Sequence, residues 1–200
     1  MKQIIKNTLI LTLITVVAGV CLGYVYEITK DPIAQARERA KQEAYRTVFQ
    51  DADSFDEGEV SHVANADAML QSLGLPGVTI NEALEAHDAS GNLLGYVMTV
   101  TDRDGYGGDI TLAMGVRMDG TLNNIAFLEL SETAGLGMKA DTPEFKGQFS
   151  DKKVDQFSIT KTGAQNEYEI DALSGATFTT TAVVDAVNGG LLYAQMMRGD

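Results

Sequence analysis

The first apolar stretch of the chain is continuous rather than periodic. Residues 7–26 carry no charged side chain and consist mainly of Leu, Ile, Val and Thr. A helix of about 20 residues spans about 30 Å, which is the thickness of the hydrocarbon core of a bilayer. The stretch therefore predicts one transmembrane helix, over residues 7–28.

Two cleaved signals are alternatives to an uncleaved anchor. Lys2 and Lys6 precede the run, as in a signal peptide, but the apolar segment is longer than the usual apolar region of such a peptide and no small-x-small site follows it. Cys21 could indicate a lipoprotein signal, yet Val20 before it is bulkier than the small residue expected there. The pattern favours an uncleaved anchor.

The next segment has helical periodicity. Asp31 is a favourable N-cap and Pro32 a favourable first helical residue, so a helix is predicted over residues 32–50. It either continues the membrane helix as a stalk or packs on the domain. Residues 51–59 are acidic and predict a solvated loop, and a short helix is expected near residues 67–73. The apolar positions that repeat at helical spacing are Ile33, Ala36, Ala40, Ala44 and Val48.

From Val78 onward, β-branched and alternating apolar residues are interrupted by Gly, Asn and Asp. These strands follow one another without a crossover helix, so the sheet should be mainly antiparallel, with helices covering one face. A final helix is predicted over residues 179–197, in which Gly189-Gly190 indicates close packing or a kink. The predicted strands cover residues 79–87, 94–101, 110–118, 122–130, 154–159 and 167–173.

The predicted fold class is α+β, a mainly antiparallel sheet with flanking helices, preceded by one N-terminal transmembrane helix. The chain divides into a tail (residues 1–6), the transmembrane helix (7–28), a stalk helix with an acidic loop (29–60) and a globular domain (61–200).

Charge and composition exclude several classes of function. The chain has 15 Lys and Arg against 28 Asp and Glu, a net charge of −13, which disfavours binding to nucleic acid or to anionic lipid. The single Cys21 lies in the apolar run, so the soluble part has no disulfide or Cys-based metal site. His62 and His87 are far apart in sequence and form no recognisable triad or metal motif. Basic residues flank both sides of the membrane run and do not decide its orientation.

The stretch before the last helix is the main candidate for chemistry. A strand ends in Ser174-Gly175-Ala176-Thr177, where hydroxyl groups gather at a helix N-terminus. Free backbone N–H groups and the helix dipole favour an anion such as phosphate there. Ordinary N-capping is the alternative, because most hydroxyl clusters before a helix do no more than cap it. On this chemistry alone, the hydroxyls that remain near equals are those of Ser174, Thr177, Thr179, Thr180 and Thr181.

Two glycine-rich loops could accompany this stretch. One is Gly105-Tyr106-Gly107-Gly108, where the absence of side chains would let the backbone approach a flat group. The other is Glu132-Thr133-Ala134-Gly135-Leu136-Gly137, which combines a carboxylate, a hydroxyl and two flexible glycines. Each alone is compatible with a plain loop.

Together, the three stretches resemble the FMN-binding domain of proteins that carry FMN on a Thr through a phosphoester. The run Ser174-Gly175-Ala176-Thr177-x-Thr, with Asp171 three residues before the Ser, is similar to the attachment motif. With one N-terminal membrane helix and 200 residues, the chain most resembles the G subunits of the Rnf complex, the ion-translocating ferredoxin:NAD oxidoreductase. The C subunits of the sodium-pumping NADH:quinone oxidoreductase share the motifs but are usually longer. The family often has Pro where Ala134 stands, which leaves this loop less rigid.

The resemblance implies a covalent FMN on Thr177, attached by a flavin transferase that takes FMN from FAD. In this interpretation Glu132, Thr133 and the backbone from Gly135 to Gly137 hydrogen-bond the ring edge, and Leu136 and Tyr106 contact its faces. The remaining residues that the resemblance assigns to the cofactor are Asp171, Leu173, Ser174, Gly175, Ala176, Gly105, Gly107 and Gly108.

The resemblance also implies partners and a location. The chain would relay electrons between other membrane and redox subunits of an Rnf-type complex and show little activity alone. It would cross the cytoplasmic membrane once, with the N-terminus inside and the domain on the extracytoplasmic side. The alternatives are a membrane-tethered scaffold or binding domain without cofactor, and a stand-alone extracellular flavoprotein reductase.

Overall fold

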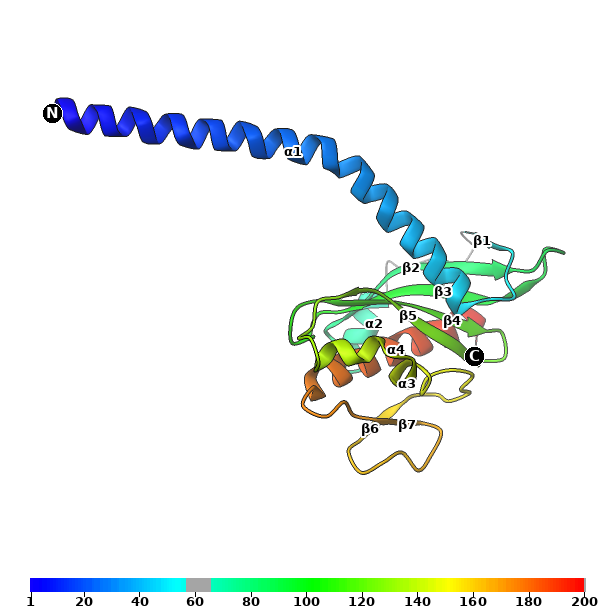
Figure 1. Cartoon of the computed structure of the whole chain (residues 1–200). Helices are drawn as coiled ribbons and strands as arrows, with labels where there is room; N and C mark the ends of the chain where they lie inside the picture. Colours follow the sequence, from blue (N-terminus) through cyan, green and yellow to red (C-terminus); the bar gives the residue numbers. More distant parts are fainter. Residues whose placement is uncertain (57–65, 200) are drawn as a thin grey trace. The chain divides into compact units, whose positions relative to one another are not determined.

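The computed structural model describes residues 1–56 and 66–199, so His62 and the end of the predicted acidic loop lie outside the described residues. The chain forms two compact units, Met1–Ala40 and Lys41–Asp200. Figure 1 shows the elements of both units, coloured along the sequence.

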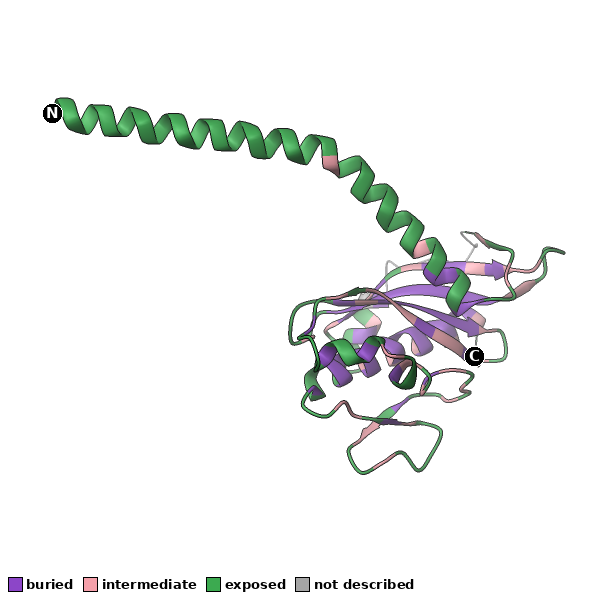
Figure 2. Ribbon diagram, in the orientation of Figure 1, coloured by how far each residue is buried: buried purple, intermediate pink, exposed green. Residues whose placement is uncertain are grey.

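The first unit is part of a single long helix, α1 (Lys2–Val48). By length and composition, α1 qualifies as a membrane-spanning helix. Its large apolar side chains are exposed, with Leu9 at 66% and Leu22 at 71%, and Figure 2 shows this part of the helix almost entirely as exposed surface. The exposed apolar surface of residues 7–26 is typical of a helix that lipid surrounds.

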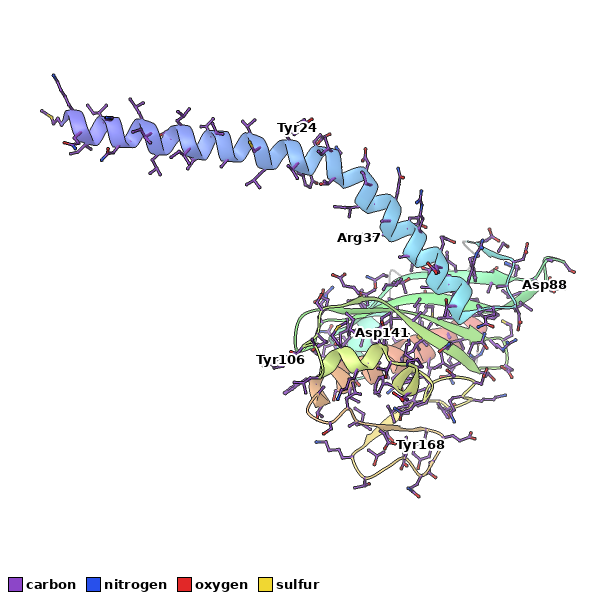
Figure 3. The ribbon with its side chains drawn as sticks, viewed as in Figure 1. Tyr24, Arg37, Asp88, Tyr106, Asp141 and Tyr168 are labelled. Carbon is purple, nitrogen blue, oxygen red and sulfur yellow. The ribbon has the colours of Figure 1, made fainter. Side chains whose placement is uncertain are left out.

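The predicted helix start at Asp31-Pro32 is wrong, because Pro32 lies inside α1. Proline lacks the N–H that would bond the carbonyl of Ile28, and its ring crowds that carbonyl. The result is a bend in the helix between Tyr24 and Arg37 (Figure 3). A long helix can therefore accommodate this proline as a bend instead of a boundary.

The second unit is built on a five-stranded sheet in the order β1-β2-β3-β4-β5, with every neighbouring pair antiparallel. This confirms the predicted α+β class and antiparallel sheet. The prediction of a loop over residues 51–59 is wrong for its middle part, because β1 pairs with β2 there and Phe55 contacts Tyr45, with ring centroids 5.7 Å apart. The strands are β1 (Ser54–Asp56), β2 (Val78–His87), β3 (Leu93–Asp102), β4 (Ile110–Arg117) and β5 (Leu122–Leu130).

One face of the sheet is covered by α4 (Thr177–Arg198), whose inner side packs on β2, β3 and β4 (Figure 2). Gly189 and Gly190 allow this close approach. A Cβ on Gly189 would lie 2.6 Å from Val78 Cγ1, and one on Gly190 would overlap Met114 Sδ. Of the two explanations that the sequence leaves open for this glycine pair, close packing is confirmed.

Helices cover both faces of the sheet, so the prediction of one covered face is wrong. Ala44, Tyr45 and Val48 at the end of α1 pack with Val97 and Ala113 on the face opposite α4. The Tyr45 hydroxyl also lies 2.7 Å from Thr99 Oγ1. The last eight residues of β3 are buried without alternation, which is the pattern of a strand covered on both sides.

The end of the chain before α4 is largely irregular. β6 (Ser158–Thr160) and β7 (Glu169–Asp171) form a separate two-stranded sheet, shorter than predicted and parallel. The short helix expected near residues 67–73 is α2 (Ala66–Ser72). A 3-10 helix, η2 (Gly137–Asp141), and α3 (Pro143–Lys146) follow the loop after β5.

Candidate functional site

The three stretches singled out by the sequence meet around one cavity of about 330 Å³. Its walls come from the loop after β3, the loop after β5 and the first turn of α4, which are separated by dozens of residues in the chain. The residues that line it are Tyr106, Glu132, Thr133, Leu136, Gly137, Gly175, Ala176, Thr177, Phe178 and Thr179.

The first turn of α4 is not capped by any of the clustered hydroxyls. Its N-cap residue is Ala176, at φ −136° and ψ 50°, and no side-chain hydrogen bond caps the turn. The preceding turn depends on Gly175, whose φ of +78° a residue with a side chain rarely adopts. The first N–H groups of α4 therefore lack intrahelical partners at the cavity, where the helix dipole favours an anion.

The five candidate hydroxyl residues differ in how far they are buried. Thr180 is fully buried and already bonded, because its Oγ1 accepts from Leu173 N at 3.0 Å and donates to Ala176 O at 2.9 Å. Ser174 and Thr181 are exposed but do not line the cavity, and Thr179 lines it but is only 1% exposed. Thr177 is the one hydroxyl of the five that is both exposed and at the cavity.

Glu132 joins the walls of the cavity. Its side chain is buried, and its Oε1 accepts a hydrogen bond from Gly107 N at 3.2 Å. A Cβ on Gly137 would lie 2.7 Å from Glu132 Oε2 and 2.6 Å from Thr179 Oγ1. Glu132, Gly137 and Thr179 thus leave no room for an additional methyl group where the second loop meets α4.

Thr179 presents an unused hydroxyl to the cavity. The residue is 1% exposed, lines the cavity, and hydrogen-bonds through its side chain to no residue that the structure describes. Thr179 was not predicted as a site residue, although it is the last Thr of the attachment motif.

Large apolar side chains stand at the opening of the cavity. Tyr106 is 74% exposed and Phe178 is 70% exposed, and their ring centroids lie 6.5 Å apart. Figure 3 shows Tyr106 at the periphery of the domain. Phe178 was missed by the sequence reasoning. The available signal was a bulky aromatic residue in the first turn of a helix, directly after the predicted attachment residue.

The remaining predicted residues do not line the cavity. Some line a second groove, and others are glycines of the two loops. Asp171, Leu173 and Ser174 line a groove of about 510 Å³ beside α3 instead of the cavity. The Asp171 carboxylate accepts a hydrogen bond from Ala164 N at 2.8 Å. The residues that shape the loops without lining the cavity are Gly105, Gly107, Gly108 and Gly135.

A buried carboxyl group stands at the start of the first loop. Asp102, at the end of β3, is 1% exposed and accepts a hydrogen bond from Asp104 N at 2.6 Å. Burial raises the pKa of Asp102 to about 6, against the lowering effect of that hydrogen bond, and the nearby charges of Asp104, Asp185 and Asp109 raise it further. Burial also raises the pKa of Asp185 on α4.

The cavity suits a phosphate-bearing, planar ligand. The uncapped helix start accommodates the phosphate, and the apolar side chains at the opening can contact a flat ring. Its volume falls in the range of about 300–1,000 Å³ that is typical of ligand pockets. Among the described residues, no group of His, Cys, Asp or Glu side chains could hold a metal ion.

A larger cavity, of about 750 Å³, lies at the other end of α4. It is lined by Asp119, Lys153, Tyr168 and Arg198 among others, and contains none of the residues that the sequence singled out. Its size alone is no evidence of chemistry.

Comparisons with known proteins agree with the location of the cavity. Residues 105–191 match the FMN-binding domain family, and residues 1–48 match the family described as the RnfG N-terminal region. The chain is 33% identical over 199 residues to the G subunit of the ion-translocating oxidoreductase complex of Methanosarcina acetivorans, covering 99% of this chain and 98% of that protein. It is 29% identical over 177 residues to the G subunit of the proton-translocating ferredoxin:NAD(+) oxidoreductase complex of Clostridium ljungdahlii, covering 88% and 84%. The crystal structure of Shewanella oneidensis NqrC is similar over 58% of each chain, at 20% identity and a TM-score of 0.48.

Proposed function

This chain belongs to the family of the G subunits of ion-translocating oxidoreductase complexes, and we propose that it relays electrons there through an FMN attached covalently to Thr177 by a phosphoester. The observation that carries the proposal is the position of Thr177. Its hydroxyl is exposed at an uncapped helix start, inside a cavity whose other walls are the two glycine-rich loops.

The residues around the cavity would hold the cofactor as follows. The N–H groups of the first turn of α4 would face the phosphate, whose remaining charge is stabilised there by about 0.3–1 kcal/mol when the site is exposed. Glu132, Thr133 and Thr179, with the backbone of 135–137, would hydrogen-bond the ring edge. Leu136 and Tyr106 would contact its faces. The FMN, when bound, supplies the electron chemistry, and the protein positions it and tunes its potential.

Attachment requires a second protein. A Thr hydroxyl is a weak nucleophile without a base beside it. No His lines this cavity, and its one carboxylate, Glu132, accepts a hydrogen bond from Gly107 N. We propose that a flavin transferase brings FAD, that the Thr177 Oγ–P bond forms while the bond between the two phosphates breaks, and that AMP leaves. The hydroxyl proton passes to a base of the transferase. Exposure of Thr177 makes it accessible to such an enzyme.

The proposed orientation is the one that the resemblance implies. Residues 1–6 would form a cytoplasmic tail and 7–28 the transmembrane helix, and the FMN-binding domain would lie on the extracytoplasmic side of the cytoplasmic membrane. The partners are the other membrane and redox subunits of an Rnf-type complex. A bound cofactor that cannot dissociate suits a relay that shows little activity alone.

The attachment residue is tested by co-expressing the full chain with a flavin transferase and viewing a denaturing gel for flavin fluorescence. The wild-type band should fluoresce and the Thr177→Val band should not. Thr181→Val is the matched control, because Thr181 is an exposed Thr of the same helix outside the cavity. A wild-type band without fluorescence, or a fluorescent Thr177→Val band, contradicts covalent attachment at Thr177.

A further inference from the structure

Three apolar side chains from three segments surround the opening of the FMN cavity. We call them the rim: Tyr106 from the loop after β3, Leu136 from the loop after β5, and Phe178 from the first turn of α4. They are 74%, 43% and 70% exposed. A single exposed apolar residue is ordinary, but a cluster at the opening of a binding cavity marks a surface that something covers.

Contact within the rim covers only part of this surface. The rings of Tyr106 and Phe178 lie 6.5 Å apart between centroids, and both side chains still leave most of their surface exposed. An exposed apolar surface of this kind is available to a protein.

Electron transfer requires a partner at this opening. Among the described residues, no group of side chains could hold a metal ion, and the single cysteine of the chain, Cys21, lies in the apolar run of α1. Within the described part of the chain, the proposed FMN is then the one redox centre. A donor or acceptor must approach it from outside, and the rim borders the cavity where it would bind.

The charges beside the rim indicate what kind of surface approaches. Asp104 and Asp109 flank Tyr106 in the same loop; both are exposed, and neither forms an ion pair with a residue that the structure describes. Arg103 is the one basic residue of this loop. The loop that contributes Tyr106 to the opening of the cavity therefore has more acidic than basic side chains, as the whole chain does. Complementary charge on a partner accelerates association and orients it.

We propose that the rim is the docking surface for a redox subunit of the same complex, which presents an apolar face bordered by basic side chains. This inference rests on the proposed function, since it assumes FMN on Thr177. It adds the surface through which the FMN exchanges electrons and the chemistry of the partner that covers it.

The test measures reduction of the FMN in the full chain, loaded by the transferase, when it is added to a complex that lacks its own copy of this chain. Phe178→Ser should lower the second-order rate of FMN reduction by about tenfold, because an aromatic residue central to an interface contributes strongly to affinity. Because Phe178 also lines the cavity, the FMN content and absorption spectrum of each variant are measured and the rate is expressed per bound FMN. Met196→Ser is the control, because Met196 is a 46% exposed apolar residue of α4 outside the cavity. It should react at the wild-type rate.

Charge is tested with Asp109→Lys and with salt. The Lys variant should react more slowly at low ionic strength, and added salt should slow the wild type more than the variant. A Phe178→Ser rate equal to that of the wild type overturns the docking surface and leaves the proposed function intact. A changed spectrum with unchanged association makes Phe178 a wall of the flavin site and also overturns it. A loaded wild-type chain that the complex does not reduce at all contradicts the proposed function itself.

Discussion

The carboxylate of Glu132 accepts a hydrogen bond from the backbone N–H of Gly107 at 3.2 Å, which links the loop after β5 to the loop after β3. Glu132 is 9% exposed, whereas Gly107 is exposed. The same carboxylate lies against Gly137 at the start of η2. One side chain therefore holds together the two loops that face Thr177.

Replacing Glu132 should loosen both loops. Glu132→Ala removes the acceptor of the Gly107 N–H, a partly buried hydrogen bond, and should lower the free energy of unfolding by about 0.5–1.5 kcal/mol. Glu132→Gln keeps an oxygen acceptor and should cost less. Urea unfolding monitored by circular dichroism measures both. Equal stabilities of the Ala and Gln variants would show that the hydrogen bond is not what Glu132 contributes.

Gly137→Ala should disturb the site by crowding. The new methyl group would lie 2.6 Å from Thr179 Oγ1 and 2.7 Å from Glu132 Oε2, and overpacking of this kind costs about 1–3 kcal/mol. Flavin incorporation by the transferase should fall as well. Ala134→Ser, an exposed change in the same loop, is the control and should alter the free energy of unfolding by less than about 0.5 kcal/mol. If Gly137→Ala had the stability and flavin incorporation of the wild type, the loop after β5 would be able to shift away from α4 and make room for the methyl group.

Thr180 should matter for stability and Thr181 should not. Thr180→Val removes the acceptor of Leu173 N and the donor to Ala176 O in a fully buried position, so we expect a loss of about 1–3 kcal/mol. Thr181→Val changes an exposed residue and should stay within about 0.5 kcal/mol. Chemical denaturation of the two variants gives the comparison. A similar loss in both would mean that helix propensity, and not the buried hydroxyl, determines the effect.

Asp102 should make the stability of the domain depend on pH. Burial raises its pKa in the folded state to about 6 from an ordinary value of 3.8, so the unfolded chain releases this proton at lower pH than the folded chain does. The contribution of Asp102 to stability is then greatest below about pH 4 and is lost as the pH rises to about 6. Asp102→Asn keeps the oxygen that accepts from Asp104 N and removes the titration.

The measurement for Asp102 is the difference in free energy of unfolding between Asp102→Asn and the wild type at several pH values. The variant should gain stability relative to the wild type as the pH rises from about 4 to about 6, and the difference should then level off. Asp104, Asp109 and Asp185 are present in both proteins, so their own titrations largely cancel. A constant difference over this range would contradict a raised pKa of Asp102.

The sequence by itself was sufficient wherever the information is local. Runs of β-branched and apolar residues bounded by turn residues located β2 to β5, because each strand is specified by its own local pattern. The continuous apolar run identified the candidate membrane helix, and the spacing of small and hydroxyl residues before α4 selected the segment that contains Thr177. The resemblance to a family then distinguished Thr177 from its neighbours, a choice that side-chain burial supports independently.

Only the tertiary structure decided what depends on contacts between distant segments. The end of α1 packs on the second face of the sheet, where Tyr45 and Val48 contact Val97 and Ala113. Helical periodicity shows which side of α1 is apolar but does not show which strands that side contacts. The structure also shows that Asp171 and Ser174 line a groove other than the cavity that contains Thr177. Phe178 lies beside Tyr106, which comes from a distant loop. Local patterns determine which element forms. The faces that two elements turn toward each other are determined by the packing of the whole chain.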